Sequence, residues 1–405
     1  MSKEKLIPEF RFPEFKDSGE WDVKTLGEVL IKNSKKNKNQ KYSQVESVSN
    51  KFGFIKQDEY FKNRRVASKD TSNYYVIKKG YFAYNPSRID VGSLAYKHND
   101  EISIISPLYV SFKANNELIN DYFLLSFFNS VTFTKQMIFE GGVRNTLNYD
   151  NLIQSKIPIP TIQEQQRIAS CLSSLDEVIE AHSKKLELLK DHKKGLLQNL
   201  FPQEGENVPK VRFPEFEEDG EWIETTLEQV ADYENGKAHE KDIDENGDYI
   251  VVNSKFISTE GETVKYSDTA FCPANLGDIL MVLSDVPNGK AIAKCFYVDE
   301  ENRYSVNQRI CRITATDCDS RFLFYIMDRN AYFLSFDDGV KQTNLRKSDV
   351  LEFPFRIPTD PVEQTKIASC LSALDELITA QQEKIAQLQQ HKKGLMQGLF
   401  PKIND

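Results

Sequence analysis

The hydrophobic pattern is most regular in two stretches of the chain, one near its middle and one at its end. From Ile168 and again from Ile367, apolar residues recur at alternating steps of four and three positions, which is the a/d pattern of a coiled-coil helix. Prolines bracket both stretches, because proline is excluded from helix interiors. We therefore predict long helices over residues 161–201 and 359–401. The seam positions are Ile168, Leu172, Leu175, Ile179, His182, Leu186 and Leu189 in the first helix, and Ile367, Leu371, Leu374, Ile378, Gln381, Ile385 and Leu388 in the second.

Polar residues interrupt this seam twice in each helix, at His182 and Lys193 and again at Gln381 and Lys392. A polar residue at a seam position costs stability but fixes the register of the pair. If the helices run antiparallel, His182 and Gln381 lie near facing midpoints, and we predict a contact between them. The alternative is that a local stutter exposes both side chains.

The two helical stretches are copies of one another, and the similarity extends beyond them. RIASCLSSLDEVIEAHSKKL is matched by KIASCLSALDELITAQQEKI, HKKGLLQNLFP by HKKGLMQGLFP, and RFPEF occurs twice ahead of a GEW. A two-copy repeat of this length indicates duplication of a whole domain rather than a solenoid. The matching segments begin at Arg11 and Arg212, Gly19 and Gly220, Arg167 and Lys366, and His192 and His391.

Between the shared segments, residues 22–160 and 223–358 carry mixed signals. Short apolar runs bounded by glycine, proline or asparagine predict strands, and one amphipathic helix is predicted in each region, over residues 117–137 and 321–336. We predict an α+β protein with two mixed α/β domains joined by two long antiparallel coiled-coil helices, and a pseudo-twofold axis from tandem duplication. Residues 1–21 form a lead and residues 202–222 a linker. The predicted strands begin at Tyr74, Ile102, Tyr249, Asp278 and Arg309.

Composition narrows the class of protein. A chain of 405 residues with 40% hydrophobic side chains can bury more than one core. No window approaches the apolar run of about 18 residues that a membrane helix needs, and the first residues lack the apolar core of a signal peptide. We therefore expect a cytoplasmic protein without membrane contact. The six cysteines form no C-x-x-C pair, which predicts buried free thiols and no metal site.

The net charge of −9 argues against a protein that binds any polyanion, because non-specific binding to nucleic acid depends on neutralising phosphates. The charge is uneven, at about +7 over residues 22–160 and about −9 over residues 223–358. Any basic residues that bind nucleic acid in the second region must therefore be focused on one face.

Motifs for cofactor chemistry are missing from the sequence. A methyltransferase would need a glycine-rich turn after a strand and an Asn/Asp-Pro-Pro-aromatic stretch, and an ATPase would need a P-loop; none of these occurs. We therefore expect this chain to bind neither adenosylmethionine nor ATP. Acidic groups such as the one from Asp244 could hold Mg²⁺ in a nuclease, but acid-rich loop tips are far commoner.

The duplicated sequence resembles the specificity (S) subunit of type I restriction-modification systems. The residues that carry the resemblance are IPIPTIQEQQRIASCLSSLDEVIE from Ile157, its second copy IPTDPVEQTKIASCLSALDELIT, the two RFPEF leads, and FAYNPSRIDVGSL from Phe82. The second copy departs from the first in having PTDPVEQ in place of PTIQEQQ. This difference affects the start of the second helix.

The resemblance implies that residues 22–160 and 223–358 are target recognition domains, each reading one half of an asymmetric bipartite site in double-stranded DNA. It also implies that the helices set the spacer and dock two methyltransferase (M) subunits, which endonuclease/translocase (R) subunits then join. The chain would then be the noncatalytic subunit of a DNA adenine methyltransferase and ATP-dependent endonuclease complex. Adenosylmethionine, ATP and Mg²⁺ are expected on the partner subunits.

Two other interpretations stay open. A stand-alone restriction endonuclease or DNA methyltransferase with built-in recognition domains needs a catalytic domain, for which the chain has little room. A purely structural coiled-coil adaptor explains the heptads but gives no purpose to two dissimilar mixed domains.

Candidates for DNA contact follow from side-chain chemistry, because Arg and Lys suit guanine or phosphate while Asn and Gln suit adenine. The lysine-rich run from Lys32 is either a mobile loop or a segment that steers the DNA backbone. The Pro-Asn-Gly turn after Ser284 is typical of a β-hairpin, and the structural role of such a turn has to be considered before a role in binding. The candidates are Lys62, Asn63, Arg64, Arg65, Tyr84, Asn85, Ser87, Arg88, Arg144, Asn145 and Thr146 in the first region, and Ser284, Asn288, Lys290, Asn307, Gln308, Arg309, Lys341, Gln342 and Thr343 in the second. We predict no catalytic residue.

Overall fold

The chain folds into two compact units. A computed structural model describes all residues except 1–5, 51, 61–67, 138–145, 287–290 and 402–405. The first unit comprises Met1–Lys184 and Glu383–Asp405, and the second comprises Lys185–Gln382. Each unit therefore holds one mixed α/β region and one half of each long helix. Below, residues 22–160 are called the first module and residues 223–358 the second module.

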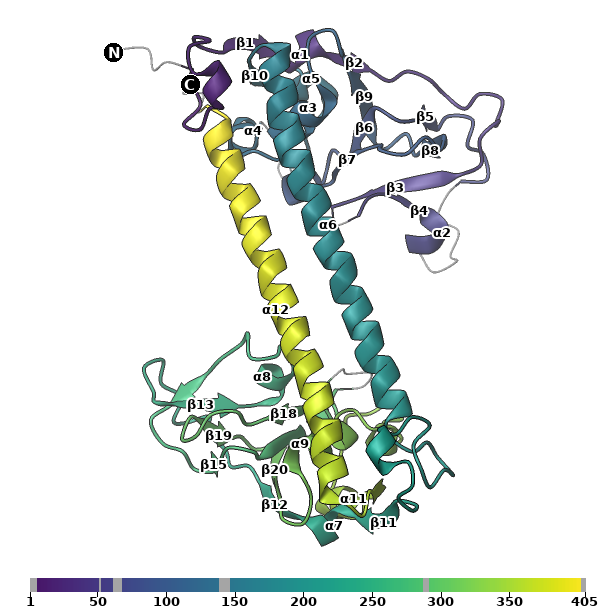
Figure 1. Cartoon of the computed structure of the whole chain (residues 1–405). Coiled ribbons are helices and arrows are strands. Elements are labelled where there is room, and N and C mark those ends of the chain that lie inside the picture. The colour runs from purple at the N-terminus through teal and green to yellow at the C-terminus, as the bar shows by residue number, and fades with distance from the viewer. Residues whose placement is uncertain (1–5, 51, 61–67, 138–145, 287–290, 402–405) are drawn as a thin grey trace. The chain divides into compact units, whose positions relative to one another are not determined.

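The first module contains two four-stranded sheets, with strand orders β2-β9-β6-β7 and β4-β3-β8-β5, and the two-stranded sheet β1-β10 (Figure 1). The strands are β1 Asp22–Thr25, β2 Leu30–Lys32, β3 Val45–Ser49, β4 Gly53–Lys56, β5 Tyr75–Ile77, β6 Tyr81–Tyr84, β7 Leu94–Tyr96, β8 Ser103–Ile105, β9 Val110–Ala114 and β10 Lys156–Ile159. The helices are η1 Pro13–Phe15 in the lead, then α1 Leu26–Val29, α2 Gln57–Tyr60, η2 Ile89–Val91, α3 Asp121–Phe128, α4 Val131–Gln136 and α5 Tyr149–Leu152.

The second module repeats this plan, with sheets β12-β20-β16-β18 and β14-β13-β19-β15 and the pairs β11-β22 and β17-β21. Its strands are β11 Ile223–Thr226, β12 Ala231–Asn235, β13 Tyr249–Val252, β14 Tyr266–Ser267, β15 Pro273–Ala274, β16 Ile279–Val282, β17 Ser284–Asp285, β18 Cys295–Tyr297, β19 Tyr304–Val306, β20 Ile310–Ala315, β21 Thr343–Asn344 and β22 Pro354–Ile357. Its helices are α7 Leu227–Val230, α8 Ser254–Ser258, α9 Ser320–Met327, α10 Ala331–Leu334 and α11 Lys347–Leu351, and η3 Pro214–Phe216 lies in the linker before it.

The two modules share their strand connections, which confirms the tandem duplication. In each, one pair of strands is parallel, β3 with β8 and β13 with β19. The registers also correspond, because Leu30 at the start of β2 pairs with Ala114, and Ala231 at the start of β12 pairs with Ala315. These pairings allow positions in one module to be matched with positions in the other.

One prediction for the modules was wrong. Each stretch that was predicted to form a single amphipathic helix forms two consecutive helices. In the first module α3 ends at Phe128 and the side chain of Ser130 accepts a hydrogen bond that starts α4. In the second module Asn330 caps α10 in the same way. A side chain that caps a new helix competes with continuation of the old one, so the apolar pattern carries across a break in the backbone.

The long helices are α6, Ile162–Asn199, and α12, Pro361–Leu399. Within the first unit the N-terminal half of α6 runs antiparallel to the C-terminal half of α12 (Figure 1). Within the second unit the C-terminal half of α6 pairs with the N-terminal half of α12 in the same manner. All predicted seam positions are buried or half-buried. The His182–Gln381 contact stays a prediction.

The lysines that interrupt the seam have partners on the other helix. Lys193 pairs with Asp375 in the second unit, and Lys392 pairs with Asp176 in the first, each with Nζ 2.5 Å from Oδ1. Each aspartate belongs to the repeated Leu-Asp of the sequence motif. A charged pair inside an apolar seam favours one register over its neighbours.

The repeated RFPEF lead is explained by a buried ion pair. The guanidinium of Arg11 donates to both carboxylate oxygens of Glu164 at 2.8 Å, with side chains 6% and 1% exposed. Arg212 binds Glu363 in the same two-pronged geometry at 2.8 and 2.7 Å. Both glutamates lie in the first turn of a long helix. The lead therefore fixes the start of each helix on its own module.

The glutamine that follows each of these glutamates binds the module itself. Gln165 accepts a hydrogen bond from the amide of Asn120 and donates to the carbonyl of Leu118. Gln364 accepts from the amide of Asp319, at the start of α9. The Glu-Gln pair of the sequence motif thus joins three parts of the chain, namely the lead, the module and the long helix.

The repeated Leu-Phe-Pro ends of the long helices complete the module cores. Leu399 and Phe400 are buried in the aromatic core of the first unit. Leu200 and Phe201 take the corresponding place in the second unit. Each module therefore needs the start of one long helix and the end of the other.

Candidate nucleic-acid interface

Two predicted groups of the first module lie next to each other. Asn85, Ser87 and Arg88 form the turn after β6, where the side chain of Asn85 accepts a hydrogen bond from the amide of Ser87. The amide of Leu147 donates to the carbonyl of Pro86 at 3.0 Å, so Thr146 is held beside this turn. Ser87 and Arg88 are exposed. The turn after β6 and the segment before α5 thus present polar side chains at one place.

The buried position of Tyr84 contradicts the prediction that this residue contacts DNA. Its side chain is 0% exposed, and its hydroxyl donates to the carbonyl of Leu147 at 3.0 Å. Burial raises the pKa of this phenol. Tyr84 is therefore too deeply buried to contact a DNA base in this fold. Its hydroxyl instead links the end of β6 to the segment before α5.

The lysine-rich run from Lys32 is anchored to the first module, and this contradicts the alternative that the run is a mobile loop. The side chain of Asn33 is buried and donates to the carbonyl of Val76 at 3.0 Å. Asn37, also buried, exchanges hydrogen bonds with the backbone of Tyr42. The ammonium of Lys36 lies 3.2 Å from the centre of the Tyr75 ring. The segment is therefore a fixed basic surface.

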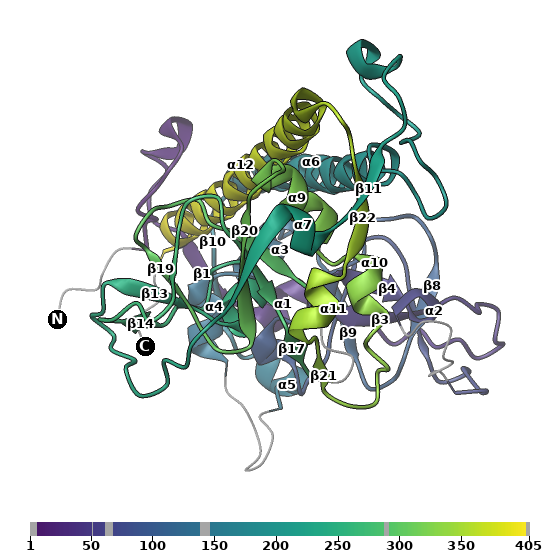
Figure 2. The same ribbon diagram turned by 90° about the horizontal axis from the view of Figure 1, so that it is seen from below.

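Three predicted groups of the second module meet although they are far apart in the sequence. The amide of Leu283 donates to the carbonyl of Arg309 at 2.8 Å, and the carbonyl of Leu283 accepts from Leu345 at 2.8 Å. The next residue, Ser284, pairs with Asn344 in the short ladder β17–β21, which lies beside α11 (Figure 2). Gln342 donates to the hydroxyl of Ser284 at 2.7 Å. The place corresponds to the one formed by the turn after β6 and the segment before α5 in the first module.

Two of the predicted contact residues, Ser284 and Thr343, are almost fully buried, and their hydroxyl groups take part in hydrogen bonds within the module. They are 7% and 6% exposed, and the hydroxyl of Thr343 donates to the carboxylate of Asp337. Lys341 and Gln342, which directly precede Thr343, are exposed. Hydrogen bonds from the amides of Lys341 and Val340 lower the pKa of Asp338, which stays charged and holds this loop.

A polar cleft of about 320 Å³ lies beside these loops and is lined by Glu240, Asn253, Ser254 and residues 307–310. Gln308 donates to the carboxylate of Glu240 at 2.8 Å. Arg309 is exposed and has a left-handed backbone with φ of 81°, a conformation that costs roughly 1–3 kcal/mol for a residue other than glycine and that concentrates at functional sites. Sequence reasoning missed Glu240, Asn253 and Ser254, because they come from other elements than the candidates.

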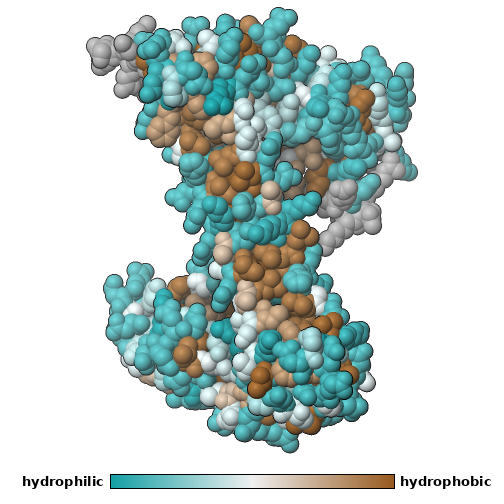
Figure 3. All heavy atoms as spheres, in the orientation of Figure 1, coloured by the Kyte–Doolittle hydropathy of each residue, from teal (hydrophilic) through white to brown (hydrophobic). Residues whose placement is uncertain are grey.

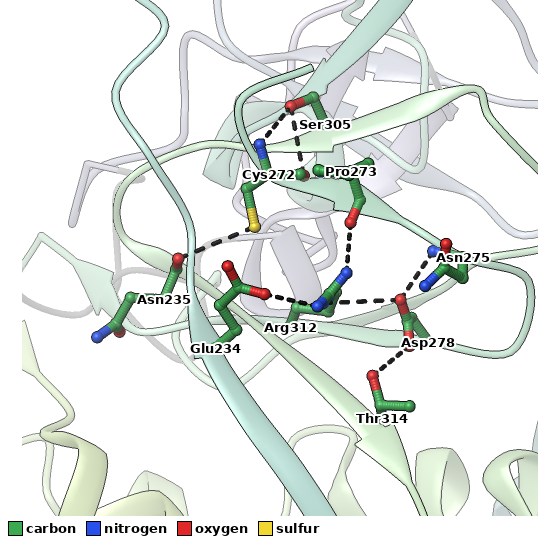
Figure 4. A network of polar contacts seen from close by, with 9 residues as sticks. All are labelled: Glu234, Asn235, Cys272, Pro273, Asn275, Asp278, Ser305, Arg312 and Thr314. Atoms are coloured by element: carbon green, nitrogen blue, oxygen red, sulfur yellow. Dashed lines mark hydrogen bonds and ion pairs between the residues drawn. The ribbon is translucent and has the colours of Figure 1, made fainter.

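The strand that carries this cleft is fixed by an arginine network (Figure 4). Arg312 on β20 donates to Glu234 on β12 and to the carbonyl of Pro273 on β15, both at 2.5 Å. Asp278, only 1% exposed, lies 3.8 Å from the Arg312 Nε and accepts a hydrogen bond from Thr314. The network joins both four-stranded sheets of the second module. It holds β20 in place immediately after Arg309.

Several predicted contact residues lie outside the described residues. They are Lys62, Asn63, Arg64, Arg65, Arg144, Asn145, Asn288 and Lys290.

The thiols and acidic groups give no sign of a reactive or metal site within the described part of the chain. All six cysteines are free, and three of them are buried. Burial raises the pKa of Cys311 to about 12, so this thiol is not activated as a nucleophile. No group of three His, Cys, Asp or Glu side chains among the described residues could hold a metal ion.

The long helices expose apolar side chains on their outer faces (Figure 3). Leu188 on α6 is 61% exposed and Leu377 on α12 is 56% exposed. Large contiguous apolar patches on a protein surface can mark sites that bind another protein. In the part of the chain that the structure describes, no helix has the length and apolar character to cross a bilayer.

Comparisons with known proteins agree with these features. The family model for the type I restriction modification DNA specificity domain matches residues 18–191 and again residues 219–390. The MjaVIII type I restriction enzyme specificity subunit of Methanocaldococcus jannaschii is 26% identical over 314 residues, which is 72% of each chain. The putative MjaX type I specificity subunit of the same organism is 24% identical over 409 residues, covering 93% of this chain and 92% of its own.

Solved structures have the same fold. The type I restriction-modification S subunit from M. genitalium has a TM-score of 0.61 at 13% identity, covering 98% of this chain and all of its own. A chain from a study of complex assembly and conformational transition in the type I R-M system has a TM-score of 0.55 at 16% identity, covering 94% of this chain and 97% of its own. At these identities the likeness concerns the fold alone. With two copies of the family domain filling most of its length, this chain belongs to the type I restriction-modification DNA specificity subunits.

Proposed function

We propose that the chain is the noncatalytic recognition subunit of a type I restriction-modification complex and reads an asymmetric bipartite site in double-stranded DNA. The observation that carries the proposal is the duplication itself. Both modules present polar side chains at the same place in the same fold, but the side chains differ. Two copies of one reader with different contact residues suit a site with two different halves.

The long helices are proposed to set the distance between the two half-sites. A helix of 38 residues is about 57 Å long at about 1.5 Å per residue. Half-sites one turn apart on the same side of B-form DNA are separated by roughly 34–36 Å, so a rod of this length has sufficient reach. The bases of the spacer would not be contacted.

The exposed apolar faces of the helices are proposed to dock two methyltransferase subunits, which endonuclease subunits then join. Adenosylmethionine, ATP and Mg²⁺ belong to these partners in the proposal, and none of them binds this chain. The anchored lysine segment of the first module supports a role in binding the DNA backbone, because such contacts position a protein without reading sequence.

Exchange of one module tests the proposal. Replacing residues 223–358 with the corresponding module of a relative, and mapping adenine methylation by the assembled complex, is expected to change one half-site and to leave the other half-site and the spacer unchanged. Exchanging residues 22–160 instead should change the opposite half-site. A change in both half-sites after a single exchange would refute independent recognition.

A further inference from the structure

Arg309, which lines the cleft of the second module, differs from the nearby Arg312 in its contacts. Its side chain is exposed, and among the described residues its guanidinium has no hydrogen-bond or ion-pair partner. Arg312, three positions later, is committed to Glu234 and to the Pro273 carbonyl (Figure 4). One arginine therefore builds the sheet, and the other offers its donors to a ligand.

The backbone holds Arg309 rigidly in its unusual conformation. Its carbonyl accepts from Leu283 at 2.8 Å, and the flanking amides of Gln308 and Ile310 donate to backbone carbonyls at 3.1 Å each. Gly236 approaches this turn so closely that a Cβ at that position would lie 2.1 Å from the carbonyl oxygen of Asn307. Because the backbone is already fixed, binding through Arg309 costs only the rotamer freedom of the side chain itself.

The surroundings of Arg309 suit a base edge better than a phosphate. The cleft holds one carboxylate, on Glu240, together with the amides of Asn253, Asn307 and Gln308. A phosphate placed against Arg309 would also meet the negative charge of Glu240. The edge of a base pair is uncharged and offers both acceptors and donors, as these side chains do.

The matching position of the first module carries a different chemistry. Counting back from the paired residues Ala114 and Ala315, Leu108 corresponds to Arg309. Leu108 is 81% exposed and has no polar group, so it can contact an apolar base edge such as a thymine methyl but cannot read guanine. The exposed residue at this position before the central strand is therefore an arginine in one module and a leucine in the other.

We propose that Arg309 reads a guanine, through its O6 and N7 acceptors, within the half-site that the second module binds. The inference rests on the proposed function, because it requires that this module reads DNA. Two parallel hydrogen bonds from one guanidinium are the commonest specific contact to guanine. The planar guanidinium presents its donors as a preorganised fork, and the fixed backbone holds the start of the Arg309 side chain at the cleft.

The test uses complexes of the full chain with the methyltransferase subunit of its own system, duplexes of random sequence, and sequencing of the bound fraction. Arg309→Gly removes the guanidinium and places at the left-handed position the residue that adopts it without strain. We expect its preference for guanine at a single position of one half-site to fall roughly 5- to 150-fold. Arg309→Lys, which keeps the charge but not the fork, is expected to be intermediate. The matched control is Arg303→Ala, at the other end of β19, where the arginine pairs with Glu300; it should keep the wild-type preference.

Each other outcome has a distinct meaning. If Arg309→Gly selects the same sequences as the wild type, Arg309 reads no base and the inference is overturned. If it weakens binding to all sequences alike and lowers the salt dependence by about one charge, Arg309 contacts a phosphate, which also overturns it. A wild-type complex that selects no sequence would overturn the proposed function, and this inference with it.

Discussion

Replacing Phe400 with alanine is expected to destabilise the first unit by about 3–5 kcal/mol, although the residue stands almost at the end of the chain. Phe400 is 2% exposed, and its ring centre lies 5.2 Å from that of Phe123 and 6.4 Å from that of Trp21. The space that the Phe400 ring occupies in the core of the first unit is not filled by any residue of the first module. Hydrogen exchange measured by mass spectrometry should show faster exchange in residues 22–160.

The duplication supplies the matched variant. Phe201→Ala removes the corresponding ring, which lies 5.3 Å from Phe322, and should accelerate exchange in residues 223–358 instead. Leu377→Ala removes an apolar side chain that is 56% exposed and should change neither region. If Phe400→Ala accelerated exchange in the second module and left the first unchanged, the assignment of helix ends to units would be wrong.

Inserting seven residues into both long helices is expected to move recognition to a site with a longer spacer. A heptad placed after Lys184 in α6 and another after Gln382 in α12 preserve the seam, because the apolar pattern repeats every seven residues. The helices lengthen by about 10 Å, which corresponds to about 3 base pairs at roughly 3.4 Å each. Methylation of the original site should be lost, and methylation of the same two half-sites at the longer spacing should appear.

A heptad inserted into α12 alone is the control for this experiment. The two helices then differ in length, so the Lys193–Asp375 and Lys392–Asp176 pairs cannot both be kept without a bulge. We expect this variant to be less stable and to lose methylation at both spacings. If the double insertion left the spacer unchanged, the helices would not be what sets it.

The long helices could be predicted from the sequence because their information is local. A seam with steps of four and three, bracketed by prolines, specifies a helix without reference to any other part of the chain. The structure places α6 at Ile162–Asn199 and α12 at Pro361–Leu399. The duplication was equally visible, because repeated letters need no geometry to be found.

The candidate site was predicted only in part, because it depends on pairing between distant segments. Ser284, Arg309 and Gln342 belong to three predicted groups that lie far apart in the sequence, and only the fold brings these groups together. Tyr84 looked like part of a polar loop because Asn and Pro follow it, but it is the last residue of β6 and its side chain points into the core. The sequence of the lysine segment allows either a mobile loop or a surface that steers the DNA backbone, and only the fold shows the buried asparagines that anchor it.

The contacts that fix the start of each long helix on its module could likewise not be predicted from the sequence. The repeats of RFPEF and of Glu-Gln were evident, but nothing in the sequence said that Arg11 binds Glu164 or that Gln165 binds the backbone beside Asn120. These contacts span more than 40 positions. A repeated motif therefore announced a shared structural role, while the partner of each residue became known only from the fold.

Sequencing of modified adenines in DNA from cells that express the assembled complex is the most direct test of the central claim, that one chain carries two different readers at a fixed separation. We predict a single motif with two unlike short blocks and a spacer of constant length whose bases vary freely. A palindromic motif, one continuous block, or blocks separated by variable distances would contradict the claim.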